Sequence, residues 1–342
     1  MSLGIQDFDF ELPQELIAQY PASPRDHARL LVYDRATGTI EDRFFYELGS
    51  YIPSNTTMVV NNSRVEKCRL LFQNGAKELF VLKSLDPYRV EALVRPGKKF
   101  KVGKEVELEA GIRVKVQSVQ PDGLRILELS HAIDDPKLDK FKYTPLPPYI
   151  EQNEDLSEEY QTVYAKEEGS KAAPTAGLHF TPSLLKSLKE QGVSLEELTL
   201  HVGMGTFAPV KSESISDHIM LEEQYYLPTE VASRLNKAQH ITAVGTTSVR
   251  VLESVVQRVE GGEDRISNRM FTAGTGSTDI FITPGYSYAG IDALITNFHL
   301  PKSTLLMLVS AWVGLEEMHR IYAHAITHKY RFYSFGDAML LK

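Results

Sequence analysis

Short apolar runs separated by turn signals dominate the first 64 residues. Residues 30–33 and 40–44 flank an Ala-Thr-Gly sequence at 36–38, a pattern that predicts a β-hairpin, and residues 57–60 predict another strand. These elements have no complete core of their own. We therefore expect them to join a larger domain formed elsewhere in the chain.

Residues 65–143 have the pattern of an all-β domain. Apolar runs at 70–72 and 79–82 are joined by an Asn-Gly turn, and further short strands follow up to residue 129. Closely spaced strands with Gly and Pro turns are typical of sandwiches and barrels. A stiff, Pro-rich crossing follows at 143–149.

The rest of the chain alternates strands and helices. Thr181 is a good helix N-cap, Pro182 suits the first helical position, and Gly192 ends that segment. Strands are predicted at 198–202, 241–245 and 291–298, and helices at 249–259, 305–313 and 318–326. We predict an α/β main domain from residues 1–64 and 144–342, with an inserted, smaller all-β barrel-like domain at 65–143.

Charge is distributed unevenly along the 342 residues. The net charge of −8 argues against a protein that coats nucleic acid. Residues 61–104, however, hold eleven Lys and Arg against four Asp and Glu, a net of +7 that includes Lys98, Lys99 and Lys101. One domain can therefore be basic although the chain is acidic.

The compartment follows from the termini and the cysteine count. Asp7 and Asp9 lie where a signal peptide would need basic residues, and the apolar run 305–313 is too short to span a bilayer. Cys68 is the only cysteine, which excludes an intramolecular disulfide and a thiolate metal cluster. We expect a cytoplasmic protein.

Three histidines occupy positions typical of α/β active sites. His201 and His299 each end a predicted strand, and His179 lies in a loop of small residues before a helix. Ligand sites of α/β folds assemble at the C-terminal ends of strands, and imidazole titrates near neutral pH. One such histidine is more often a satisfied hydrogen-bonding group, but three favour chemistry.

Two further motifs have plainer interpretations. Gly203 and Gly205 have the spacing of a dinucleotide loop, but Pro209 directs the chain into extended structure, so a tight turn is favoured. His324 and His328 are four residues apart and could chelate a metal. Because no catalytic Glu lies between them and no third ligand follows, we interpret them as a polar helix face and predict no metal site.

Several longer segments carry a common signature. They are DFDFELP at 7–13, the run 61–65, YQTVYA at 160–165, AAPTAGLHFT at 172–181, LHVGMGTF at 200–207, GTTSVR at 245–250, TDIFI at 278–282, ITNFHLPKSTLLML at 295–308, and the runs 330–332 and 335–339. In this order they resemble the S-adenosylmethionine:tRNA ribosyltransferase-isomerase family of queuosine biosynthesis over nearly the whole chain.

The resemblance implies a specific reaction. The family transfers and isomerises the ribosyl part of S-adenosylmethionine onto the 7-aminomethyl-7-deazaguanine at the tRNA wobble position, giving epoxyqueuosine and releasing adenine and methionine. S-adenosylmethionine is then a co-substrate, no prosthetic group is needed, and the anticodon arm of tRNA is the partner. A monomer is expected.

Candidate roles follow from what this reaction needs. Proton transfer is assigned to His179, His201 and His299. The S-adenosylmethionine pocket is assigned to Thr175, Gly177, Gly203, Gly205, Thr206, Thr246 and Asp279. Contacts with tRNA are assigned to Arg25, Arg64, Lys98, Lys99, Lys101 and Arg250. A non-catalytic protein that binds modified tRNA and an S-adenosylmethionine-dependent RNA methyltransferase remain as alternatives.

Overall fold

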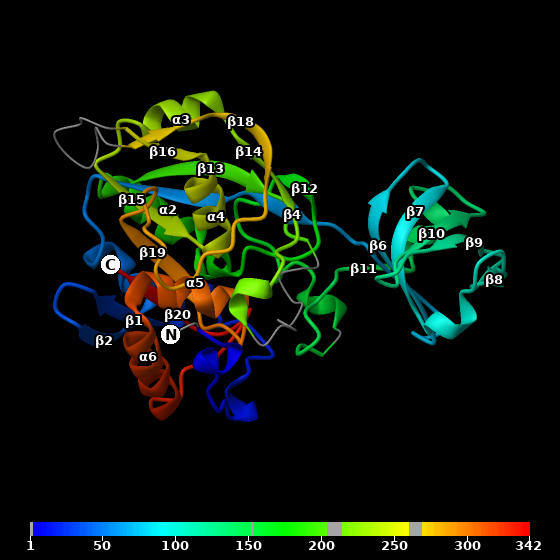
Figure 1. Ribbon diagram of the computed structural model, residues 1–342, viewed down its shortest axis with the longest axis horizontal. Coiled ribbons are helices and arrows are strands. Elements are labelled where there is room, and N and C mark those ends of the chain that lie inside the picture. Colours follow the sequence, from blue (N-terminus) through cyan, green and yellow to red (C-terminus); the bar gives the residue numbers. More distant parts are fainter. Residues whose placement is uncertain (1–2, 152, 204–213, 260–268) are drawn as a thin grey trace. The chain divides into compact units, whose positions relative to one another are not determined.

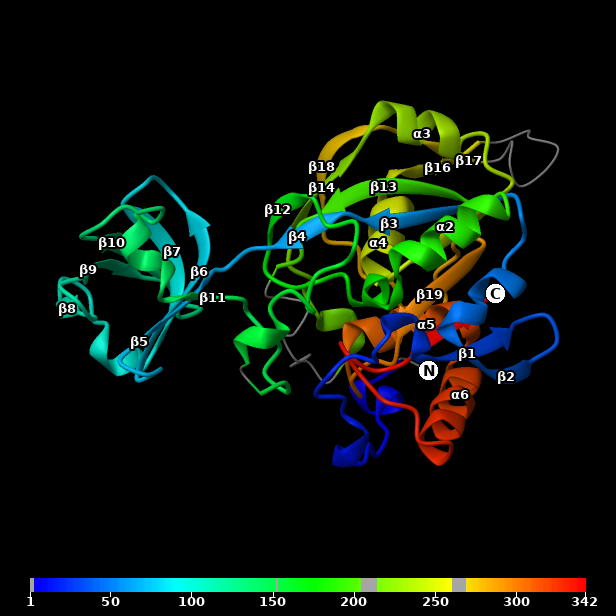
Figure 2. The same cartoon turned by 180° about the vertical axis from the view of Figure 1, so that it is seen from behind.

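The computed structural model describes residues 3–151, 153–203, 214–259 and 269–342, which divide into two compact units. Unit 1 comprises Met1–Arg64, Pro147–Glu151 and Glu158–Lys342, and unit 2 comprises Val65–Leu146 and Gln152–Ser157. Figure 1 labels their helices and strands, and Figure 2 shows them from behind. Within the described residues, no helix is both long and apolar enough to cross a membrane.

Unit 1 is built on a mixed sheet. In the described part of the chain it has nine strands in the order β18-β14-β13-β3-β15-β19-β20-β1-β2. The bounds are β1 Arg29–Asp34, β2 Thr39–Phe44, β3 Thr56–Asn61, β13 Ser194–Leu200, β14 Glu223–Leu227, β15 His240–Val244, β18 Gly274–Thr278, β19 Ala293–Asn297 and β20 Ala338–Leu341. Strands β13, β3, β15 and β19 are parallel, so their C-terminal ends share one edge of the sheet.

Helices cover both faces of this sheet. They are α2 Pro182–Glu190, α3 Thr229–Leu235, α4 Thr246–Val255, α5 Thr304–Val313 and α6 Leu315–Thr327. Met58 and Val60 on β3 pack in one apolar cluster with α2, whereas Val59 packs in the other with α3 to α6. Successive strand residues point to opposite faces, so the sheet is buried between two layers.

Smaller elements complete unit 1. Strand β4 (Ser63–Val65) pairs with β12 (Glu167–Ser170), and β16 (Val256–Arg258) pairs with β17 (Arg269–Phe271). The short 3-10 helices of unit 1 in the described chain are η1 Ile5–Phe8, η2 Gln14–Leu16, η3 Arg25–His27, η4 Phe45–Ser50, η7 Thr175–His179 and η9 Ile215–Asp217, whereas η5 Gly97–Lys99 and η6 Glu154–Leu156 belong to unit 2.

Unit 2 is an antiparallel sheet of seven strands in the described chain, in the order β11-β5-β6-β7-β10-β9-β8. The bounds are β5 Arg69–Phe72, β6 Lys77–Ser84, β7 Arg89–Arg95, β8 Glu105–Glu107, β9 Arg113–Val119, β10 Arg125–Leu129 and β11 Lys142–Tyr143, with the short helix α1 at Pro136–Asp139. Register shifts at Val81 and at Ile126 bend the strands around a core that includes Phe72 and Phe100.

Most predicted elements are present, and one boundary is wrong. The hairpin of β1 and β2 is confirmed, and Thr181 caps α2 by accepting a hydrogen bond from the Leu184 N–H. The helix predicted at 249–259 instead begins at Thr246 and ends at Val255, where the chain turns into β16. The Gly-Gly pair at 261–262, which follows the predicted helix in the sequence, lies outside the described residues.

Candidate active site

A cavity lies where β15 and β19 end. It holds about 70 Å³ of space open to water, enough for several water molecules. The lining comes mainly from residues 173–176, 245–247, 296–300 and 333–334, with Tyr149, Val202, Ser303 and Leu305. All of these belong to unit 1. The cavity therefore occupies the sheet edge at which α/β folds bind ligands.

The turn after β15 forms one wall. Gly245 has φ +86°, a conformation that side chains other than glycine rarely adopt, and the chain enters α4 directly afterwards. The Ser248 hydroxyl donates a hydrogen bond to the Val244 carbonyl at 2.8 Å, which fixes the first turn of α4. This geometry brings Thr246 and Thr247 to the cavity.

The end of β19 forms the opposite wall with polar side chains. Nδ2 of Asn297 lies 3.1 Å from the Tyr333 carbonyl and 3.1 Å from Nε2 of His179. Nε2 of His299 lies 2.9 Å from the Thr296 hydroxyl. Among the described residues, Asn297 Oδ1 and Thr247 Oγ1 are buried and have no hydrogen-bond partner. Two polar atoms beside the cavity are therefore unsatisfied.

Burial keeps two of the three candidate histidines neutral. Desolvation lowers the pKa of His299 to about 3. Desolvation, with Arg331 and Arg25 as nearby cations, lowers the pKa of His179 to about 3. A ring with such a pKa holds no extra proton at neutral pH and is a weak base, so both act as hydrogen-bonding groups in this structure. The pKa of His201 is also lowered, by burial first, with Glu167 opposing and Lys171 adding to the shift.

The structure brings only some of the predicted pocket residues together. Thr175, Thr246 and His299 line the cavity. His179 lies behind Asn297, and a Cβ added at Gly177 would meet the Tyr164 hydroxyl.

The other predicted pocket residues lie away from the lining. His201 packs against Gly169, the Gly203 N–H donates to Glu223 Oε1 at 2.7 Å, and Asp279 is exposed after β18. Gly205 and Thr206 lie outside the described residues.

The predicted tRNA-binding cations differ in exposure. Lys98, Lys99 and Lys101 are exposed in unit 2. In unit 1, Arg25 forms an ion pair with Glu159 at 2.8 Å, and Arg64 lies 3.9 Å from a carboxylate oxygen of Glu158.

Arg250 is buried in unit 1. Its side chain is 6% exposed and pairs with Glu223. The guanidinium therefore takes part in an internal ion pair, which the sequence did not indicate, and its contact with tRNA stays a prediction.

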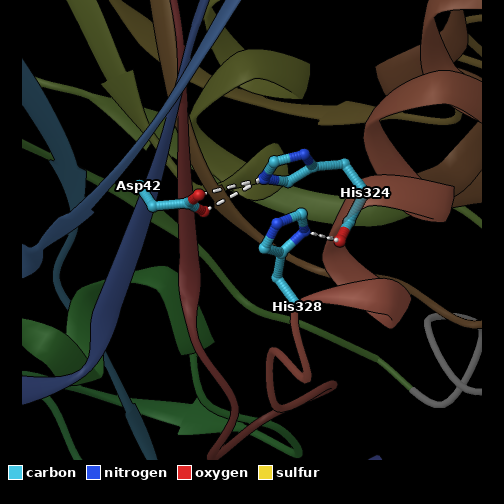
Figure 3. Close-up of side chains that lie close together, drawn as sticks. All are labelled: Asp42, His324 and His328. Carbon is cyan, nitrogen blue, oxygen red and sulfur yellow. Dashed lines mark hydrogen bonds and ion pairs between the residues drawn. The ribbon is translucent and has the colours of Figure 1, made fainter.

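His324 of α6 and His328, which follows the helix, have a third neighbour that the sequence did not indicate. Figure 3 shows Asp42 of β2 facing His324, with Nε2 at 3.1 Å from Oδ1, while His328 Nδ1 lies 2.9 Å from the His324 carbonyl. Asp42 also accepts a hydrogen bond from the Tyr330 hydroxyl and lies 3.5 Å from Arg29.

These contacts set the charge of Asp42. Burial is the largest single influence and raises its pKa, but the hydrogen bonds from Tyr330 and His324 together with the nearby charges of His324 and Arg29 outweigh it, so the pKa lies below its ordinary value. The cluster links β2 to α6 through a carboxylate that is ionised at neutral pH.

Sequence reasoning missed two polar residues of the cavity, Asn297 and Thr247. Asn297 is the last residue of the buried strand β19, and an amide at the C-terminal end of such a strand is a signal that could have identified it. Thr247 lies between the predicted strand at 241–245 and the predicted helix at 249–259, where no apolar pattern marks it.

Comparisons with known proteins agree on one family. Residues 5–341 match the family model described as queuosine biosynthesis protein. The chain is 45% identical over 352 residues to the S-adenosylmethionine:tRNA ribosyltransferase-isomerase of Desulfitobacterium hafniense, covering 99% of this chain and 100% of that protein. It is 46% identical over 351 residues to the protein of the same name from Clostridium kluyveri, with the same coverage.

A solved structure supports the same relationship. The chain is similar to the crystal structure of S-adenosylmethionine tRNA ribosyltransferase from Thermotoga maritima, with a TM-score of 0.54 and 35% sequence identity. The similarity covers 98% of this chain and 100% of that one.

Proposed function

The chain belongs to the queuosine biosynthesis protein family, and from this premise we propose that its cavity in unit 1 carries out the ribosyl transfer and isomerisation. The enzyme acts on S-adenosylmethionine and tRNA. Its product is epoxyqueuosine at the wobble position, formed from the 7-aminomethyl-7-deazaguanine already present there, and adenine and methionine are released. It works as a cytoplasmic monomer.

One observation carries the placement of S-adenosylmethionine. Thr175, Thr246 and His299 lie far apart in the sequence but line one cavity at the C-terminal ends of parallel strands. None of the described lining residues is Asp, Glu, Lys or Arg. A cavity without charged side chains suits the nucleoside part of S-adenosylmethionine, because an isolated charge would be poorly solvated there.

The proposed reaction proceeds in three stages. A base removes a proton from the carbon beside the sulfonium, the ribose ring opens to a vinyl sulfonium, and adenine leaves with a proton as the ring oxygen becomes an aldehyde. The free amine of the tRNA base then adds to the vinyl sulfonium and loses a proton, and the resulting ylide carbon attacks the aldehyde carbon, which closes the five-membered carbocycle and leaves an alkoxide. Finally, this alkoxide attacks the neighbouring carbon that bears the sulfonium and closes the epoxide, while methionine leaves with the electrons of its sulfur–carbon bond.

The histidines divide these tasks by their surroundings. His299 lines the cavity but has a pKa of about 3, so it donates or accepts a hydrogen bond rather than holding a proton. His201 is only half-buried, and its pKa is less strongly perturbed than that of a fully buried ring. We assign orientation of the bound nucleoside to His299, whereas proton transfer by His201, which lies away from the described lining, stays a prediction from the sequence.

Unit 2 supplies the contact with tRNA. Lys98 and Lys99 lie in η5 and Lys101 follows it, and all three are exposed. Each phosphate that a cation neutralises contributes about 0.7 to 0.9 to the slope of log affinity against log salt. Replacing the three lysines by Ala should lower that slope by about 2 to 3. The control is Lys237→Ala, which removes an exposed cation of unit 1. It should change the slope by no more than about 0.9, the contribution of one phosphate contact.

Product analysis tests the reaction. Purified protein is incubated with S-adenosylmethionine and precursor tRNA, and adenine and S-adenosylhomocysteine are measured by chromatography. We expect one adenine for each modified tRNA and no S-adenosylhomocysteine. Formation of S-adenosylhomocysteine would indicate a methyltransferase, and tRNA binding without either product would indicate a binding protein.

A further inference from the structure

Asn297 is held at the cavity wall by two hydrogen bonds that use the same nitrogen. It ends β19, is 2% exposed and lines the cavity. Its Nδ2 is 3.1 Å from the carbonyl oxygen of Tyr333 and 3.1 Å from Nε2 of His179. The two partners lie 36 and 118 residues away along the chain, so tertiary structure fixes this side chain.

The Tyr333 carbonyl fixes which way the amide faces. A carbonyl oxygen only accepts hydrogen bonds, so the amide atom facing it must be the NH2 group. That nitrogen then donates its second hydrogen to Nε2 of His179, which must be unprotonated. The His179 ring therefore carries its proton on Nδ1, in agreement with the burial that keeps this histidine neutral.

This arrangement leaves Asn297 Oδ1 as a fixed acceptor without a donor. The atom is buried and has no partner among the described residues. A buried amide oxygen that forms no hydrogen bond is destabilising, and such atoms in native proteins call for a specific explanation. Because Asn297 lines the cavity, a ligand bound there can supply the missing N–H.

The composition of the lining selects among the donors of S-adenosylmethionine. The described lining has no carboxylate to pair with the methionine ammonium, and Pro174, Leu300 and Leu305 give it an apolar character. A neutral N–H on a flat apolar group fits best. We infer that Asn297 Oδ1 accepts a hydrogen bond from the exocyclic amino group of adenine and makes the enzyme selective for that base. This inference rests on the proposed function.

The contact recognises the base and does not act on the reacting atoms. The exocyclic amine is present before and after adenine leaves, so the hydrogen bond stabilises ground state and transition state alike. Its loss should raise KM and change kcat little. Asn297 is therefore a specificity-determining residue, and His179 and Tyr333 are its positioning groups.

Two substrate analogues test the inference on the wild-type enzyme. One carries purine in place of adenine and lacks the amine, and the other carries hypoxanthine, whose C6 oxygen would face Oδ1. We expect kcat/KM to fall about ten- to hundredfold with the purine analogue, mainly through KM, and further with the hypoxanthine analogue. Equal kcat/KM for S-adenosylmethionine and the purine analogue would overturn the inference, whether or not any variant folds.

Variants separate recognition from structure. In Asn297→Ala the ratio of kcat/KM between S-adenosylmethionine and the purine analogue should approach one. Asn61→Ala is the matched control, since Asn61 ends β3 of the same sheet, is fully buried, and its side chain forms hydrogen bonds with the backbone of Leu200 and Ser63. That variant should keep the wild-type ratio even if its activity drops. An unchanged ratio in a folded Asn297→Ala protein would contradict the inference.

The proposed function is tested separately in the same experiment. If S-adenosylmethionine itself yields no adenine with precursor tRNA, the proposed reaction is wrong. If adenine is released and both analogues react as well as S-adenosylmethionine, only the role of Asn297 is wrong.

Discussion

Mild acid should destabilise unit 1 through two buried histidines. The pKa values of His179 and His299 are lowered from 6.5 to about 3, by desolvation first in both cases. Between these values the unfolded chain binds a proton at each ring and the folded chain does not, so stability falls as the pH drops from about 6.5 towards 3. From pH 7 to pH 5 each histidine should lower the free energy of unfolding by about 2 kcal/mol, and both together by about 4 kcal/mol.

The single tryptophan makes this measurable. Trp312 is the only tryptophan in the chain, lies on α5 and is 3% exposed, so its fluorescence reports unfolding of unit 1. Urea titrations at pH 7 and pH 5 give the change in the free energy of unfolding. His299→Gln, which keeps a polar group near Thr296, should remove about half of the pH dependence, and His179→Gln should remove a similar part. His328→Gln, at an exposed position after α6, is the control.

Two results would refute this reasoning. One is a free energy of unfolding that stays the same between pH 7 and pH 5 in the wild-type protein. The other is a wild-type pH dependence that persists in both buried-histidine variants, because other groups would then carry it.

Three further predictions use the same urea titration at pH 7. Glu223→Ala leaves Arg250 buried without the Glu223 carboxylate and should lower stability by about 3 to 5 kcal/mol, more than Glu223→Gln; equal small losses would argue against a strong pair. Gly177→Ala places a Cβ about 2.0 Å from the Tyr164 hydroxyl and should lower the free energy of unfolding by about 1 to 3 kcal/mol. Adding Tyr164→Phe to this variant should restore part of the lost stability; no rescue would mean that the clash lies elsewhere. Thr181→Ala removes the cap of α2 and should cost about 1 kcal/mol, whereas Thr181→Ser should cost less.

Local sequence signals predicted the elements that local interactions determine. The hairpin of β1 and β2 follows from two short runs on either side of a turn signal, and the start of α2 follows from Thr181 and Pro182. The start of α4 was missed because threonine and serine are weak helix formers, and burial against the sheet overrides that preference. The length of α4 was missed because β16 forms through pairing with β17, which lies farther along the chain.

Residues of the site could be predicted only where a single segment of the sequence marks a strand end or a loop. Thr175, Thr246 and His299 lie at strand ends or loops that the sequence marks, and they line the cavity. The role of Asn297 depends on distant partners, which no local pattern specifies. A local pattern also cannot specify the contact of Asp42 with His324, which lies 282 residues away, or the ion pair between Arg250 and Glu223.

The position of β20 bears on how the protein forms during synthesis. This strand follows every other described strand in the chain, yet it lies inside the sheet between β19 and β1. Until residues 338–341 have left the ribosome, the N-terminal hairpin has no strand to join and the edge of β19 is open. Nascent chains should therefore remain dependent on chaperones until translation has passed β20, and a stop codon just before it should yield an aggregating product.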